Sequence, residues 1–119
     1  MKLMLVADPA VLPGLSGQFA RPAVALPEVD WSREAVLVID MGEQRTAGYG
    51  VSVVAVTRSA AGEVELQLEI RRPGPGSFVA QVITHPYTVV RVDREWLTGA
   101  TVVARDQHGQ EVLRQVVSL

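Results

Sequence analysis

Residues 63–71 read Glu-Val-Glu-Leu-Gln-Leu-Glu-Ile-Arg, an unbroken alternation of polar and aliphatic side chains. Successive side chains of a β-strand point to opposite faces, so this register puts four aliphatic residues on one face and the charges on the other. A helix would spread the same aliphatic residues around its circumference. The stretch therefore predicts a strand with one buried face. The carboxylates of Glu63, Glu65 and Glu69 are interpreted as a solvated face.

Valine-rich segments on both sides of this stretch predict further strands, because β-branched residues favour a pleated, half-buried surface. The runs at 35–41 and 49–58 carry apolar residues on both faces, as central strands do. The other expected strands are residues 2–7, 80–84, 88–92, 100–105 and 110–117. The fold class predicted is all-β, an antiparallel two-sheet β-sandwich of about seven or eight short strands, with a small closed β-barrel as the alternative.

Short connections with turn residues separate these strands. Residues 59–62 and 106–109 each end in glycine, which suits a type I turn closed by a left-handed glycine. Residues 93–97 are predicted to form one helical turn, capped by Asp93 and stopped by Gly99. Residues 9–27, with four prolines and two glycines, are expected to be an irregular wrapping segment.

Composition limits the function classes. A chain of 119 residues is expected to form one all-β domain over residues 1–119. A net charge of −2 without a basic stripe argues against a nucleic-acid partner, and no apolar run approaches the length of a membrane span. The absence of cysteine excludes disulfides and thiolate chemistry. The apolar run near the N-terminus is too short for a signal peptide, so the chain as given is expected to be cytoplasmic.

No catalytic or metal-binding constellation is apparent. His85 precedes a proline and His108 lies in a tight turn, and no Gly-x-Ser-x-Gly elbow accompanies either of them. Two distant histidines do not make a zinc signature, which needs three or four closely spaced ligands. The prediction is a protein that is not an enzyme, with no metal and no cofactor.

Three loops are predicted to bind a partner. The segment 42–50 presents arginine and tyrosine, residues favoured at interfaces, and Gly48 is expected to have a positive φ. Two Pro-Gly steps in segment 71–78 predict successive type II turns and a stiff loop. Segment 85–87 is expected to be a kink, because proline cannot donate to a ladder. The predicted contact residues are Arg45, Thr46, Gly48, Tyr49, Arg72, Pro73, Pro75, Gly76, Phe78, His85, Pro86 and Tyr87.

The loops around Arg45 and residues 72–78 are expected at one end of the sandwich, because two antiparallel strands separate them. Segment 85–87 follows after one more expected strand. It joins the other two loops only if residues 80–84 kink or switch sheets, as Pro86 permits.

The same segments resemble the C-terminal domain of the PrcB family of protease-complex subunits. The resemblance rests on Gly42-Glu43, Thr46-Ala47-Gly48-Tyr49, Pro73 with Pro75-Gly76-Ser77, and Gln81 with Thr84-His85-Pro86-Tyr87. It covers residues 29–93, with Ala47 standing where a second glycine is usual. It implies a non-catalytic partner of a protease. It also implies a place in the cell envelope or outside the cell if a leader has been removed.

The predicted function is a non-catalytic protein-binding or accessory module that associates with a protease or stabilises it. One alternative is a peptidase inhibitor, because Thr46-Ala47-Gly48-Tyr49 resembles the Thr-Thr-Gly-Tyr/Phe loop of chagasin-type inhibitors, although the later spacings differ. The other is a structural β-domain that self-associates as a homo-oligomer through an edge strand.

Overall fold

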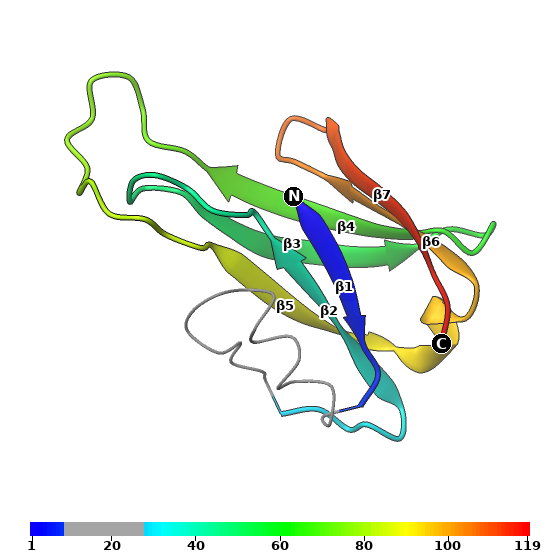
Figure 1. The fold of residues 1–119 in the computed structure, drawn as a ribbon. Coiled ribbons are helices and arrows are strands. Elements are labelled where there is room, and N and C mark those ends of the chain that lie inside the picture. The colour runs from blue at the N-terminus through cyan, green and yellow to red at the C-terminus, as the bar shows by residue number, and fades with distance from the viewer. Residues whose placement is uncertain (9–27) are drawn as a thin grey trace.

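The computed structural model describes residues 1–8 and 28–119, in which seven strands form two sheets (Figure 1). The elements are β1 (Lys2–Val6), β2 (Glu34–Asp40), β3 (Gly50–Arg58), β4 (Val64–Arg71), β5 (Tyr87–Asp93), the 3-10 turn η2 (Arg94–Leu97), β6 (Ala100–Arg105) and β7 (Glu111–Val117). One sheet has the order β1-β2-β5 and the other β3-β4-β6-β7. The predicted all-β fold is confirmed as sandwich-like, and the described strands do not close into a barrel. The expected wrapping segment, residues 9–27, lies outside the described residues.

The main core lies between the two sheets and follows the predicted alternation. Val64, Leu66 and Leu68 of β4 are completely buried, and Ile70 is nearly so. From the other sheet, β2 contributes alternate residues such as Leu37 to the same cluster. Burying each such side chain contributes about 1.5–3 kcal/mol. The prediction that residues 63–71 form a strand with a buried aliphatic face is therefore confirmed.

One strand pair departs from the expected antiparallel arrangement. β4 and β6 run parallel, with Val64 beside Val102 and Gln67 beside Arg105. The chain between them passes through the other sheet as β5 and returns through η2, so β6 enters beside β4 in the same direction. The prediction of a wholly antiparallel sandwich is wrong at this pair, and the four-stranded sheet is mixed.

The two strands expected to be central differ in position. β2 lies between β1 and β5 and is buried on both faces, as predicted. β3 is instead the edge of its sheet and pairs only with β4. Its register shifts between Val53 and Ala55, and Val54 is 63% exposed. A bulge of this kind interrupts an edge strand and discourages edge-to-edge pairing.

Residues 80–84 do not form the strand that was expected there. Only Thr84 is paired, in an isolated bridge with Gln44. The β2–β5 ladder ends with the pair Asp40 and Tyr87, and the next pair is Gln44 and Thr84. Gln44 lies four residues after Asp40, whereas Thr84 lies three residues before Tyr87. The extra residue falls beside Gly42, whose φ is +83°. This register slip, with Pro86 unable to donate, interrupts the ladder before it becomes a regular strand.

The glycine-closed turns are formed as predicted. Gly62 (φ +82°) donates to Ser59 O at 3.0 Å, and Gly109 (φ +77°) donates to Asp106 O at 3.0 Å. The single helical turn is also present as η2. Asp93 precedes it without a capping hydrogen bond from its side chain, so that part of the expectation is wrong. No helix among the described residues is long and apolar enough to cross a membrane.

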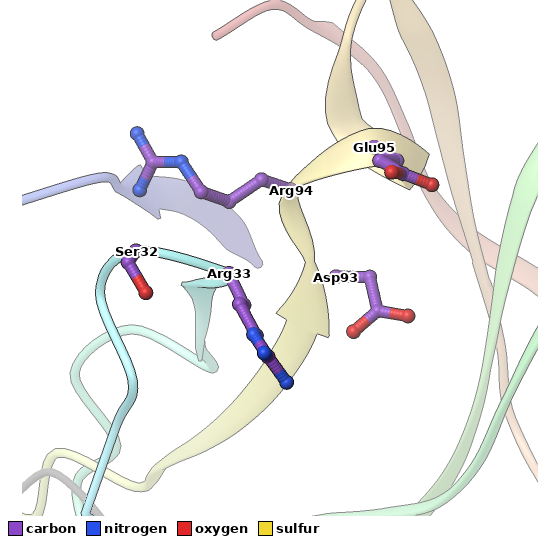
Figure 2. Close-up of a pocket in the computed structure, with 5 residues that line it drawn as sticks. All are labelled: Ser32, Arg33, Asp93, Arg94 and Glu95. Carbon is purple, nitrogen blue, oxygen red and sulfur yellow. The ribbon is translucent and has the colours of Figure 1, made fainter.

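Arg94 joins three segments at the end of the sandwich near η2. Its Nη1 donates to the carbonyl oxygens of Ala7 and Trp31 at 3.0 Å and of Glu34 at 3.3 Å. Figure 2 shows its side chain extending over the end of β1. A pocket of about 440 Å³ lies here, lined by Ser32, Arg33, Asp93, Arg94 and Glu95. Because the Arg94 guanidinium already binds backbone carbonyls, we assign it a structural role.

Candidate functional site

Two long connections leave the same end of the sandwich. Residues 41–49 join β2 to β3, and residues 72–86 join β4 to β5. Asp40 is the register partner of Tyr87, and Gly50 is the partner of Arg71, so all four strand ends lie together (Figure 1). The predicted clustering of the loops is confirmed, and segment 85–87 joins them because residues 80–84 do not cross the sandwich as a strand.

The two connections are bonded to each other along their length. We call residues 41–47 and 80–86 together the arm. Met41 N donates to Pro86 O at 2.9 Å, and Ala47 N donates to Ala80 O at 3.0 Å. Between them, Gln44 and Thr84 exchange both backbone hydrogen bonds at 2.9 Å. These bonds continue the β2–β5 pairing beyond the body of the sandwich and fix the two loops relative to each other.

Gly48 lies where the first loop contacts the second. Its φ is +96°, as predicted from its position between two apolar strands. A Cβ atom at this position would lie 3.0 Å from Pro73 Cγ and 3.2 Å from Val79 Cγ1. Backbone conformation and close approach therefore both require glycine here.

The Pro-Gly segment contains one tight turn. Ser77 N donates to Gly74 O at 3.1 Å, with Pro75 and Gly76 (φ +76°) at the central positions. This combination is typical of a type II turn. Gly74 does not have a positive φ, so the expected second type II turn at Pro73-Gly74 is wrong. The remaining turn still shapes the tip of the loop that precedes Phe78.

Large apolar side chains are exposed beyond this turn. Phe78 is fully exposed (105%), and Val82 and Ile83 are 52% and 63% exposed. All three belong to one seven-residue stretch, and contiguous exposed apolar residues commonly mark interaction surfaces. The sequence pattern indicated Phe78 but not Val82 or Ile83, because residues 80–84 were interpreted as a sandwich strand. The run between residues 73 and 84 is uncharged, but a buried strand is uncharged too, so the sequence carried no signal of their exposure.

Exposed arginines lie on the arm and where β4 ends. Arg45, Arg71 and Arg72 are exposed, and none of them forms an ion pair within the described part of the chain. The acidic residues nearest to them in sequence are Glu43 and Glu69, which are also exposed. The side chains available to a partner here are therefore apolar and, on balance, basic.

The other predicted contact residues divide by exposure. Gly48, Pro75 and Gly76 are exposed with the arginines and Phe78. The half-buried members are Thr46, Tyr49, Pro73, His85, Pro86 and Tyr87. Tyr87 packs against the small cluster of Val6, Val36 and Val38 on the outer face of the three-stranded sheet. The exposed members form the accessible surface, and the half-buried ones hold it in place.

The described residues contain no group of three His, Cys, Asp or Glu side chains that could hold a metal ion. His108 is exposed in the β6–β7 turn, and His85 is half-buried in the arm. In the part of the chain that the structure describes, two carboxylates are buried, and both accept hydrogen bonds in turns. Asp40 accepts from Gly42 N, and Asp106 accepts from His108 N and Gln110 N.

A known family matches the part of the chain that contains the two connections, residues 41–49 and 72–86. Residues 35–93 match the PrcB C-terminal family. The match begins in β2 and ends with β5, so it includes the arm and all twelve predicted contact residues. The PrcB resemblance read from the sequence is confirmed over this range. No curated protein and no solved structure gives a significant match to the chain.

Proposed function

We propose that this chain is a non-catalytic protein-binding module that associates with a protease and acts as its accessory subunit. The observation that carries the proposal is the exposed apolar stretch containing Phe78, Val82 and Ile83, held on an arm whose two sides are hydrogen-bonded to each other. A surface fixed in advance loses little conformational entropy on binding. The PrcB C-terminal match over residues 35–93 supports a protease as the partner.

The test is co-purification with proteases encoded beside this chain. We expect the wild type to retain a protease and a variant with Phe78→Ala, Val82→Ala and Ile83→Ala to lose it. Val116→Ala is the matched control, because Val116 is 72% exposed but lies on β7. Equal recovery by all three proteins, or no protease in any of them, would contradict the proposal.

The non-catalytic part of the proposal has its own test. Purified protein should give only background rates with generic peptidase, esterase and glycosidase substrates. Turnover that His85→Ala abolishes would show instead that the chain is an enzyme.

A chagasin-type inhibitor is the second candidate, and the gathering of the loops at one end favours it. Such an inhibitor inserts its loops together as a wedge, and here Gly48 is exposed beside Pro73. Thr46 and Ala47, however, are hydrogen-bonded to the opposite side of the arm, which leaves the apolar stretch as the more accessible part. Inhibition of papain by the wild type, and its loss in Gly48→Val, would favour the inhibitor over the accessory subunit.

A further inference from the structure

Residues 78–84 read Phe-Val-Ala-Gln-Val-Ile-Thr, an uncharged run with strong β-propensity and neither proline nor glycine. Such a run is normally covered or interrupted by charge when it lies at a sheet edge, because it pairs readily with other strands. Its residues 80–84 belong to the arm, and Val82 and Ile83 are more than half exposed. Its exposure indicates a surface that binds another polypeptide.

The hydrogen-bond pattern shows which backbone groups are free. Ala80 and Thr84, four residues apart, both direct backbone groups to the 41–47 side of the arm. By alternation along an extended chain, we expect the N–H and C=O groups of Gln81 and Ile83 at the opposite, outer edge. Neither Gln81 nor Ile83 makes a hydrogen bond within the described part of the chain.

Both edges of the four-stranded sheet differ from this one. β3 has its bulge at Val54 and ends in Arg58. β7 carries Arg114, which forms ion pairs with Glu111 at 2.8 Å and with Glu63 at 3.5 Å. Charges and bulges of this kind discourage pairing. Residues 78–84 have neither, so the arm is more suited to accept a strand than either edge of the four-stranded sheet.

We propose that the outer edge of residues 79–85 binds an extended segment of the partner protein, which adds to the arm as a further β-strand. The segment would exchange backbone hydrogen bonds with Gln81 and Ile83. It would place apolar side chains at alternate positions on one face, beside either Val82 or Ile83, because consecutive side chains of an extended chain point to opposite faces. It would also place an acidic residue within reach of Arg45 or Arg72. This inference rests on the proposed function and names the mode of recognition.

A second copy of this chain is the less suitable occupant. A stable interface buries roughly 1,200–2,000 Å², so two short paired edges need further contacts around them. Pairing two copies would also bring together two sets of exposed arginines without ion pairs, whereas an acidic partner would neutralise them. A larger protein can add contacts to Phe78 and to the base of the arm.

The probe is a displayed library of random nonapeptides selected on the full chain. Selected sequences should alternate apolar residues and include an acidic one. Gln81→Pro removes the outward N–H, while Gln81→Ala keeps it, so this matched pair isolates the backbone donor. We expect Gln81→Pro to weaken the best peptide at least about tenfold and Gln81→Ala to change its affinity less than about twofold. Thermal unfolding of both variants checks that they are folded.

Three results from the peptide and assembly experiments would overturn the inference. These are the absence of any selected peptide, equal binding by the two Gln81 variants, and a dimer of the chain that Gln81→Pro dissociates. Protease co-purification separates this inference from the proposed function. If Gln81→Pro still retains the protease and the triple alanine variant does not, the accessory function stands and strand addition is wrong.

Discussion

The hydroxyl group of Thr84 donates a hydrogen bond of 3.0 Å to the carbonyl oxygen of Thr46, 38 residues earlier in the chain. The same two segments are joined by the backbone bonds between Gln44 and Thr84. The arm is thus held by contacts distant in sequence. Its rigidity can be altered without touching the exposed apolar residues.

Thr84→Val should loosen the arm while preserving side-chain shape. The substitution leaves the Thr46 carbonyl without its side-chain donor, at a cost of about 1 kcal/mol. Amide hydrogen exchange at Ala47 should accelerate in this variant. Thr57→Val, at an exposed position on β3, is the control and should leave that rate unchanged. Equal exchange rates at Ala47 in both variants would contradict the role assigned to Thr84.

Gly48→Ala and Gly76→Ala form a second comparison. Both glycines have positive φ, but a Cβ at Gly48 would meet Pro73 and Val79, whereas nothing lies within 4 Å of a Cβ at Gly76. Backbone strain costs about 1–3 kcal/mol at either position. We expect Gly48→Ala to lower the free energy of unfolding more, because contact adds to strain. Chemical denaturation measures both, and a smaller loss at Gly48 would show that the contact relaxes freely.

Arg94→Lys tests the junction beside η2. An ammonium group cannot reproduce the three bonds that the guanidinium makes to Ala7, Trp31 and Glu34, so we expect a loss of about 1–3 kcal/mol. Arg33→Lys is the control, because the Arg33 side chain is 85% exposed. The midpoints of urea unfolding should separate the two variants. Coincident midpoints would mean that Arg94 contributes no more than a surface arginine.

Acidification should weaken the turn before β2. The Ser32 hydroxyl and backbone N–H donate to Asp30 Oδ1 at 2.6 and 3.1 Å, and these bonds lower the pKa of Asp30. A lowered pKa in the folded state means that the stabilisation is present above the ordinary aspartate pKa of about 3.9 and is lost as pH falls through the lowered value. Asp30→Asn should reduce the slope of the thermal midpoint between about pH 2 and 5. If the pH dependence of the thermal midpoint is unchanged in Asp30→Asn, another carboxylate causes the acid sensitivity. Glu111 is one example, because Arg114 lowers its pKa.

Local patterns predicted the parts of the fold that local chemistry determines. The alternation around Leu66 and Leu68 fixed which face is buried, and Gly62 and Gly109 marked turns that only a left-handed residue closes easily. Strand direction placed the loops around Arg45 and residues 72–78 at one end, whereas the position of segment 85–87 depended on residues 80–84 not forming a strand.

Non-local features were missed. Whether β6 pairs with β4 in parallel depends on the path of the intervening chain, which leaves no mark on either strand. β3 has the composition of a central strand, but its edge position and its bulge at Val54 depend on what lies beside it. Val82 and Ile83 have the composition of buried strand residues, so composition alone could not show that they are exposed.

The parallel β4–β6 pair bears on where this protein can be divided. The family match ends at residue 93, yet β4 has one of its two neighbours in β6, and β2 has one of its neighbours in β1. A fragment cut at the limits of the match would lose both neighbours and uncover Leu66, which is completely buried. We therefore expect that the matched segment does not fold by itself. Grafting the arm onto another protein would require carrying β1, β6 and β7 with it.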